Sequence, residues 1–281
     1  MLRKGLALAA LGLALLAGPA SAATSFEEPK DVHWSFEGPF GKFDQAQLQR
    51  GYKVYREVCS ACHSMNLMYF RNLGQKGGPF YDPKYPNPND NPYVKSLAKD
   101  IQVKDIDGDT GDVIQRPAGS ADKFPNPFAN EAAAAASNGG KAPPDLSVMA
   151  KAREGGPAYI YSLLTGFEEP PKGLTALPGK YYNPYFPGDV SGSWTGAKGA
   201  VPKGGFIGMT PPLSAGKVTF DDGKPSTVDQ EAKDVVAFLA WAAEPKMEDR
   251  KQFGLGALIY LLIFSGLLYA SYKKIWRNVS H

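Results

Sequence analysis

The chain has 281 residues, of which 31 are basic and 28 acidic, so its formal net charge is +3. This near balance excludes the strongly basic surface that nucleic-acid-binding proteins carry. Only two cysteines are present, which excludes a framework of several disulfides. The length suits one domain with insertions once targeting segments are set aside.

The first 22 residues have the pattern of a secretory signal peptide. Two basic residues near the start are followed by an apolar run from Leu6 to Ala17 and by small residues at Ala20-Ser21-Ala22. The run is too short to cross a bilayer, so a transmembrane or amphipathic start fits it less well. We therefore expect an exported protein whose mature chain begins near Ala23.

A helix is expected to lead into the first functional motif. Asp44 is a suitable N-cap, and Leu48, Tyr52 and Tyr55 recur at helical spacing as far as Cys59.

The sequence Cys59-Ser60-Ala61-Cys62-His63 has the attachment pattern of c-type haem. The two cysteines sit on one turn of chain, so each thiol can form a thioether with one haem vinyl group. His63 then points its imidazole at the iron from the same side, which makes it the candidate proximal ligand.

A zinc site would need two more ligands, and only His33 and His281 remain. A disulfide would not require the adjoining histidine. We therefore expect one covalently bound haem c.

The middle of the chain is rich in proline, glycine and asparagine. Clusters of these residues at 85–92, 124–128 and 183–188 predict loops. Long loops in a compact domain normally need something to pack on, and the haem can be that surface. Short helices are expected at 132–136 and 146–153, and no sustained alternation of apolar and polar residues predicts a strand.

The second axial ligand of the iron must come from a distant part of the chain. Met209 lies between glycines and prolines in the 204–212 stretch, where glycines let the backbone approach the haem ring and prolines fix the loop. A thioether opposite a histidine is the ligand pair that raises the potential of cytochromes c. The alternative is that Met209 only fills a gap in the core. Four other methionines are less suitable as the second axial ligand. Met65 and Met68 lie too close to His63, Met149 lies in a predicted helix, and Met247 lies close to the predicted membrane segment described below.

A late helix is expected from Val228 to Ala243, where apolar residues recur at helical spacing and Pro245 follows the end. An early helix that runs into the haem motif and a late helix that closes the domain predict a mainly α fold. We expect a c-type cytochrome domain with long loops packed on one haem, plus a single C-terminal transmembrane helix.

The stretch from Phe253 to Tyr272 contains 20 residues and no charge. As a helix it would be ~30 Å long, the thickness of the hydrocarbon core. Basic residues follow it, which favours a cytoplasmic C-terminus. Basic residues also precede the stretch, so charge alone does not decide its orientation. The predicted signal peptide decides it, because export places the haem domain outside the membrane. A buried core helix is the alternative. The expected plan is a signal peptide at 1–22, a periplasmic haem domain at 23–245, a juxtamembrane linker at 246–252, a transmembrane helix at 253–272 and a cytoplasmic tail at 273–281.

Longer motifs are distributed over nearly the whole mature chain. Besides the haem motif and the C-terminal anchor, they are Phe36-Glu37-Gly38-Pro39-Phe40, Ala142-Pro143-Pro144-Asp145-Leu146-Ser147, Tyr159 to Gly166, Tyr182-Asn183-Pro184-Tyr185-Phe186-Pro187-Gly188, Ile207 to Leu213 and Trp241-Ala242-Ala243-Glu244-Pro245. Together these motifs resemble the cytochrome c1 family, the haem subunits of cytochrome bc1 complexes, and its alpha-proteobacterial members in particular.

The resemblance implies roles for individual residues. It makes Met209 the axial ligand opposite His63. Arg153 matches an arginine that meets a haem propionate, although a solvated charge after a helix is the alternative for it. Pro143, Pro144 and Tyr159 match residues of the haem pocket.

The resemblance also implies a function. The chain would be an electron-transfer subunit of a ubiquinol:cytochrome c oxidoreductase in a respiratory or photosynthetic chain. It would receive electrons from the Rieske iron–sulfur protein and pass them to a soluble or membrane-tethered cytochrome c. Cytochrome b would be a partner in a dimeric complex in the inner membrane of a bacterium. A haem enzyme or ligand sensor with an open sixth position is one alternative. An anchor or assembly subunit with a structural haem is another.

Two stretches are not explained by the motifs. The 189–203 segment separates the 182–188 motif from the Met209 loop, where mitochondrial members of the family are shorter. Four aspartates fall between 105 and 112. A calcium-binding loop that started at Asp105 would need a glycine one place before Gly111 and a glutamate at the final ligand position, where Arg116 lies. Both differences count against calcium binding. Because the family presents acidic groups to a basic cytochrome c, this acidic stretch is a candidate for steering the acceptor.

Overall fold

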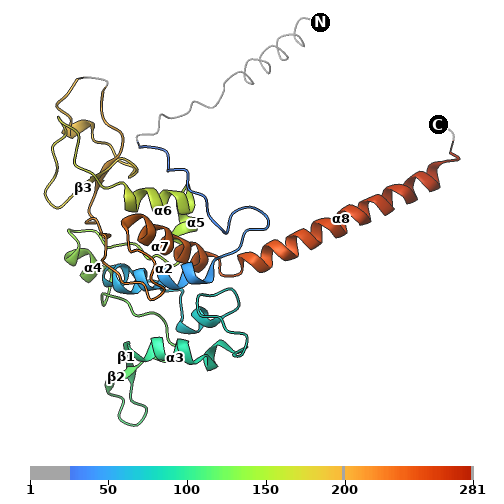
Figure 1. Ribbon diagram of the computed structural model, residues 1–281, viewed down its shortest axis with the longest axis horizontal. Coiled ribbons are helices and arrows are strands. Elements are labelled where there is room, and N and C mark those ends of the chain that lie inside the picture. The colour runs from blue at the N-terminus through green and yellow to red at the C-terminus, as the bar shows by residue number, and fades with distance from the viewer. Residues whose placement is uncertain (1–25, 198–199, 280–281) are drawn as a thin grey trace, which may run out of the picture.

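The computed structural model describes residues 26–197 and 200–279, so the predicted signal peptide lies outside the described residues. The described chain forms a mainly helical body, from which one long helix projects (Figure 1). This agrees with the predicted fold class.

Two helices form the centre of the body. Helix α2 (Gln45–Glu57) begins at Asp44, whose carboxylate accepts a hydrogen bond of 2.7 Å from the backbone N–H of Gln47. Helix α7 (Val228–Ala243) begins at Thr227, whose hydroxyl accepts from the N–H of Gln230. Both helices were predicted, because a capping residue followed by apolar residues at helical spacing is a local signal that needs no tertiary information.

The two helices pack closely at Gly51. A Cβ atom at this position would lie 2.0 Å from the carbonyl oxygen of Asp234 on α7, so only glycine permits the contact. Beside it, Arg50 donates from Nε to the fully buried carboxylate of Asp234 at 2.7 Å and from Nη1 to Asp222 at 2.6 Å. A buried carboxylate needs such a partner, because desolvation of an unpaired charge is costly.

The other helices are short. They are α3 (Pro92–Lys99), α4 (Glu131–Ser137), α5 (Met149–Ala152) and α6 (Gly156–Thr165), with 3-10 turns at Cys59–Ala61, Phe70–Gly74, Pro88–Asp90 and Ser191–Ser193. Helices α5 and α6 pack on α7. The predicted helix at 132–136 is confirmed, and the one at 146–153 is shorter than expected. Helix α3 was not predicted, although the Asn91 side chain caps it and Pro92 occupies its first turn.

Two small antiparallel sheets interrupt the helical body. Strands β1 (Gln102–Ile106) and β2 (Val113–Pro117) form a hairpin in which Ile106 pairs with Val113. Strands β3 (Tyr181–Asn183) and β4 (Gly205–Ile207) pair through Tyr182 and Phe206. These strands are too short for an alternating pattern to reveal them, since a strand of three residues contains little more than one period.

The core is divided into two clusters. The large one joins α2, α6 and α7 with the aromatic rings of Tyr52, Tyr55, Phe70 and Phe124. The small one consists of Leu174, Tyr182 and Val190, with Trp194 and Phe206 packed against them. We call residues 167–197 and 200–207 around the small cluster the satellite lobe.

The described part of the unexplained 189–203 segment, residues 189–197 and 200–203, belongs to the satellite lobe. Trp194 forms a β-bridge with Leu174, and its indole N–H donates to the carbonyl of Ala197 at 3.0 Å. The lobe is tied to the body at α6, where the Asn183 amide donates to the carbonyl of Leu163 at 2.8 Å. The segment therefore helps to build the lobe from which the Met209 loop emerges.

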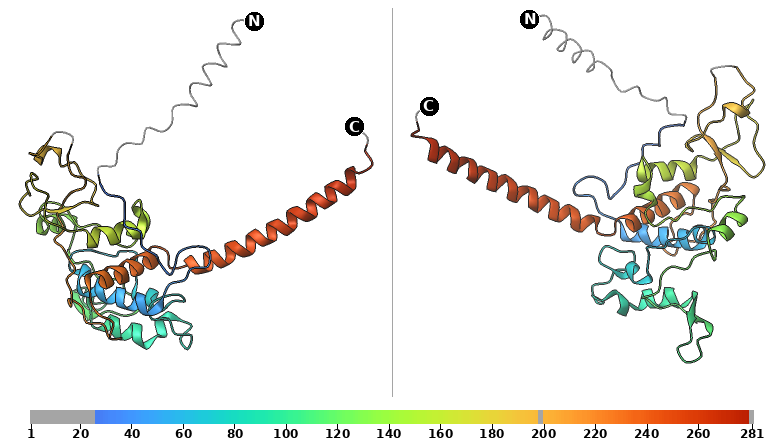
Figure 2. Two further views of the ribbon diagram at one scale, coloured as in Figure 1. Left: turned by 45° about the horizontal axis from the view of Figure 1, so that its top comes forward. Right: turned by 180° about the vertical axis from the view of Figure 1, so that it is seen from behind.

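Helix α8 (Met247–Trp276) leaves the body directly after α7. The predicted 253–272 segment lies within it, and the helix already begins at Met247, so most of the expected linker is helical. Among the described residues, α8 is the one helix long and apolar enough to cross a membrane. The helix projects away from the body (Figure 2), and its large apolar side chains from Phe253 to Trp276 are exposed.

Candidate haem site

The attachment motif forms one tight turn at the end of α2. The backbone N–H groups of Cys62 and His63 both donate to the carbonyl of Cys59, at 3.1 and 2.9 Å. Both thiols are free, with Cys59 half-buried and Cys62 exposed. Burial, together with the neighbouring Cys62, raises the pKa of the Cys59 thiol to about 12. The turn therefore presents two thiols and an imidazole within five residues.

The His63 ring is oriented by a backbone carbonyl. Its Nδ1 lies 2.8 Å from the carbonyl oxygen of Pro144. Because a carbonyl only accepts, Nδ1 carries the proton and Nε2 keeps a free lone pair. Burial lowers the pKa of His63, against the opposing effects of the Pro144 carbonyl and the Asp145 charge. A neutral imidazole held in this way is the form that ligates iron.

Asp145 fixes the segment that carries this carbonyl. Its carboxylate accepts hydrogen bonds from the Ser64 hydroxyl at 2.8 Å, the Asn66 N–H at 2.7 Å and the Ser147 N–H at 2.8 Å. Burial raises the pKa of Asp145, but these hydrogen bonds outweigh it and hold the pKa below its usual value of 3.8. Asp145 lies in the 142–147 motif, and the sequence did not predict a role for it.

The methionines separate into two groups. Met65, Met68 and Met247 are buried in the large core cluster, and Met149 packs against it. Met209 is half-buried and belongs to neither cluster. A methionine that only filled a gap would lie inside a core. Its position therefore favours a ligand role over that alternative.

The loop that carries Met209 is fixed by close backbone packing. Gly204 has φ +97°, and a Cβ atom there would lie 2.4 Å from Cα of Pro184. A Cβ at Gly205 would lie 2.9 Å from Cα of Gly188. The sequence led us to expect that glycines in this stretch let the backbone approach the haem ring. Within the chain, the close neighbour of these two glycines is the backbone of the 183–188 turn.

The remaining predicted site residues lie around α5 and α6. Arg153 follows α5 and is exposed, and Tyr159 is buried on α6. Burial raises the pKa of Tyr159 and the charge of Arg153 opposes the rise, which indicates that the two groups lie near each other. Pro143 is half-buried beside Pro144. The body thus carries the imidazole, the arginine and the tyrosine, while the Met209 thioether lies two residues beyond the end of the satellite lobe.

The donor set fits a haem better than a bare metal ion. In the part of the chain that the structure describes, no group of three or more His, Cys, Asp or Glu side chains is placed to hold a metal ion. One imidazole with a free Nε2 and one thioether are the axial pair of low-spin c-type haem iron. Two free thiols on the same turn as the imidazole suit its covalent attachment.

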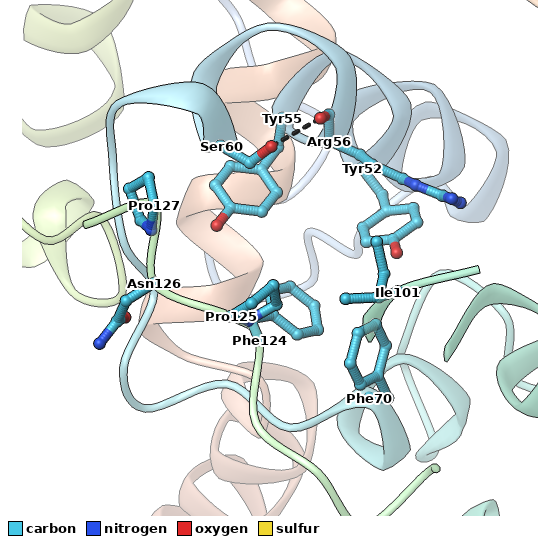
Figure 3. Close-up of a pocket in the computed structure, with 10 residues that line it drawn as sticks. All are labelled: Tyr52, Tyr55, Arg56, Ser60, Phe70, Ile101, Phe124, Pro125, Asn126 and Pro127. Atoms are coloured by element: carbon cyan, nitrogen blue, oxygen red, sulfur yellow. Dashed lines mark hydrogen bonds between the residues drawn. The ribbon is translucent and has the colours of Figure 1, made fainter. Parts of the chain in front are cut away.

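A pocket lies behind the attachment turn (Figure 3). It is lined by Tyr52, Tyr55, Arg56, Ser60, Phe70, Ile101, Phe124, Pro125, Asn126 and Pro127. It includes Ser60, whose hydroxyl donates to the carbonyl of Arg56 at 2.6 Å, but neither cysteine. The ring centroids of Phe124 lie 5.9 Å from Tyr55 and 5.0 Å from Phe70. Sequence analysis treated 124–128 only as a loop and so missed this aromatic support for the motif.

Comparison with known proteins agrees with this geometry. The model of the Cytochrome C1 family matches residues 34–279. The chain belongs to the cytochrome c1 family. It is 42% identical to cytochrome c1 of Rhodospirillum rubrum, with 98% of this chain and 97% of that protein covered. It is 41% identical to cytochrome c1 of Blastochloris viridis, with 95% and 93% covered.

A longer relative is cytochrome b/c1 of Bradyrhizobium diazoefficiens, 43% identical over 98% of this chain. The chain spans only 40% of that protein's length. Family membership makes the chain a haem-carrying electron-transfer subunit of a cytochrome bc1 complex.

The Asp145 network gives a stability prediction. Asp145→Asn replaces a carboxylate that accepts three hydrogen bonds with an amide whose NH2 group would face one or more of the donors. We therefore expect a loss of about 1–3 kcal/mol in the free energy of unfolding at neutral pH. Since the folded pKa is lowered, the wild-type contribution is present above pH 3.8 and is lost as the pH falls through the folded pKa. The difference between the two proteins should therefore shrink in acid.

Denaturant unfolding of the two proteins at neutral and acidic pH measures this. Asp189→Asn is the control, because that carboxylate serves only its own exposed turn through the Ser191 N–H. A variant as stable as wild type at neutral pH would show that Asp145 does not fix the Pro144 segment.

Proposed function

We propose that the chain carries one covalently bound haem c and passes electrons from a Rieske iron–sulfur protein to a soluble or membrane-tethered cytochrome c. The observation that carries the proposal is the pairing of His63 Nδ1 with the Pro144 carbonyl, which leaves Nε2 free beside two free thiols. The haem supplies a site that accepts and releases one electron.

Each site residue has a distinct task in this proposal. Cys59 and Cys62 would hold the haem through thioethers, and His63 Nε2 and the Met209 sulfur would ligate its iron. With both ligands supplied by the protein, the site would favour electron transfer over chemistry on an added ligand.

The surrounding residues shape the haem environment. Arg153, which is exposed after α5, would meet a haem propionate with its guanidinium. Pro143, Pro144 and Tyr159 form part of the wall that excludes water from the ring.

The chain is a subunit rather than a complete enzyme. Quinol oxidation belongs to the wider ubiquinol:cytochrome c reductase, and cytochrome b is the expected partner in the membrane. The Bradyrhizobium relative, named cytochrome b/c1, supports this association. We propose a dimeric complex in the inner membrane of a bacterium.

The proposed topology follows the charge and length of the two ends. Residues 1–22 would be removed as a signal peptide, and residues 23–245 would form the periplasmic haem domain. The segment 253–272 of α8 would cross the membrane, with 246–252 at its outer surface. The tail 273–281 would then lie in the cytoplasm, in keeping with its basic residues.

Covalent attachment is tested directly at the cysteines. Cys59→Ala and Cys62→Ala each remove one thioether, so the yield of mature haem protein should fall sharply. A denaturing gel stained for haem peroxidase activity measures the yield, and Ser60→Ala in the same turn is the matched control. Wild-type protein that releases its haem into acidic acetone would contradict the proposal.

The axial ligand is tested at Met209. Met209→Leu removes a sulfur ligand that stabilises Fe(II), so the midpoint potential should fall by a large amount and the reduced iron should bind carbon monoxide. Gly204→Ala should weaken the same ligand indirectly, since its positive φ and the close approach of Pro184 strain any side chain by about 1–3 kcal/mol.

Redox titration and carbon monoxide difference spectra measure both variants. Gly192→Ala is the control, because nothing lies within 4 Å of a Cβ there. An unchanged potential and spectrum in Met209→Leu would mean that another group ligates the iron.

We further propose that the β1–β2 hairpin steers a basic cytochrome c. Of its four aspartates, Asp105 is paired with Arg116 at 2.5 Å, and Arg116 also binds Asp122 at 2.7 Å. Asp109 and Asp112 are exposed and Asp107 is half-buried, at the end of a hairpin that projects from the body (Figure 1). These three carboxylates would therefore carry most of the steering.

Neutralising Asp107, Asp109 and Asp112 to Asn should slow electron transfer to the acceptor by roughly tenfold at low salt. The effect should fade as salt rises, because exposed charges are screened over ~8–10 Å at physiological ionic strength. Stopped-flow oxidation of the reduced complex across a salt series measures it. Glu168→Gln with Glu169→Gln, on the satellite lobe, is the matched comparison. Equal rates for the hairpin variant and wild type at low salt would place the docking face elsewhere.

A further inference from the structure

A closed loop near the start of the described chain carries an exposed aromatic residue at its tip. The N–H of Lys42 donates to the carbonyl of Ser35 at 3.0 Å and closes the loop. A Cβ at Gly41 would lie 1.9 Å from the carbonyl oxygen of Glu37, so the closure requires glycine. Phe40 is 75% exposed. The loop is therefore a built structure with a phenylalanine directed away from the core.

The base of this loop is held in the core by aromatic contacts. Phe36 is buried, and its ring lies 5.5 Å from that of Trp34 and 4.9 Å from that of Phe43. Packing of these rings, of which Phe43 is half-buried, fixes the two ends of the loop. The position of Phe40 is thus set by packing rather than left to the motion of a free loop.

The loop is also bound to the first turns of α8. The Lys251 ammonium donates to the carbonyls of Phe36 at 2.7 Å and Gly41 at 3.2 Å. The N–H of Phe43 donates to the Glu248 carboxylate at 3.0 Å. Figures 1 and 2 agree in placing the dark-blue N-terminal segment alongside the start of α8. The loop and the helix therefore form one unit.

The level of this unit follows from the sequence of α8. The uncharged stretch begins at Phe253, two residues after Lys251, which is about 3 Å along a helix axis. Phe40 adjoins Gly41, whose carbonyl binds Lys251. A single exposed aromatic is ordinary on a soluble surface. One fixed at the entry of a membrane-spanning helix lies where aromatic side chains anchor proteins in the lipid interface.

We propose that Phe40 inserts into the headgroup region of the phospholipid bilayer, as a second membrane contact beside α8. Two contacts on one rigid unit would fix the tilt of the haem domain over the membrane. A single helix alone leaves the domain free to lean. The proposal rests on α8 crossing the membrane as proposed above, and the experiment below separates the two.

The test places the photoreactive residue benzoylphenylalanine at one position at a time in the full chain, within the complex in its native membrane. Position 40 is the test. Tyr93, also an exposed aromatic at 63%, is the matched control on α3, which lies apart from α8. Leu262 in the middle of α8 reports on the spanning helix itself. Irradiation followed by mass spectrometry identifies phospholipid or protein adducts.

We expect phospholipid adducts at positions 40 and 262 and none at 93. Adducts at 262 but none at 40 would overturn the Phe40 contact while leaving the α8 span intact. A protein adduct at 40 would also overturn it and would assign the loop to a neighbouring subunit. Absence of lipid adducts at both 40 and 262 would overturn the span and the loop contact together. Haem staining of each variant verifies that it is folded and loaded.

Discussion

The close crossing of α2 and α7 at Gly51 determines where the other parts of the molecule lie. Helix α2 runs directly into the attachment turn, and α7 runs almost directly into α8. The crossing therefore links the proposed haem attachment to the membrane-directed helix through two rigid elements. Any side chain at Gly51 would push the helices apart, because the Asp234 carbonyl occupies that space. Such a displacement would move the histidine relative to α8.

The proximal side of the site is held by hydrogen bonds that are local in space but distant in sequence. His63 and Pro144 are 81 residues apart, as are Ser64 and Asp145. Asp145 joins the chain just after His63 to the segment that carries Pro144, so the protein itself sets the orientation of the imidazole. A ligand held in advance loses little entropy when it binds, which favours a defined iron geometry.

The sequence alone predicted the features that depend on neighbouring residues. The caps and periodicity of α2 and α7, the attachment turn and the long apolar helix all express short-range rules. Helix α3 escaped detection because Asn91-Pro92 ends a cluster of turn residues, although the same pair is a helix start. The Asp145 network and the satellite lobe could not be predicted from the sequence for a different reason. Contacts such as Leu174 with Trp194, or Asn183 with Leu163, join residues whose proximity only the folded chain reveals.

The satellite lobe has a consequence for how such a protein can change over evolution. The residues proposed to attach the haem lie on the body, whereas Met209 follows a lobe with its own small core. Under the proposed ligation, substitutions around Trp194 or Phe206 would shift the thioether by small steps without disturbing the thiols or the histidine. The strength of the proposed axial bond, and with it the driving force for electron transfer, would then be adjustable separately from cofactor retention. A chain with this division can be matched to a new redox partner through changes in a surface lobe.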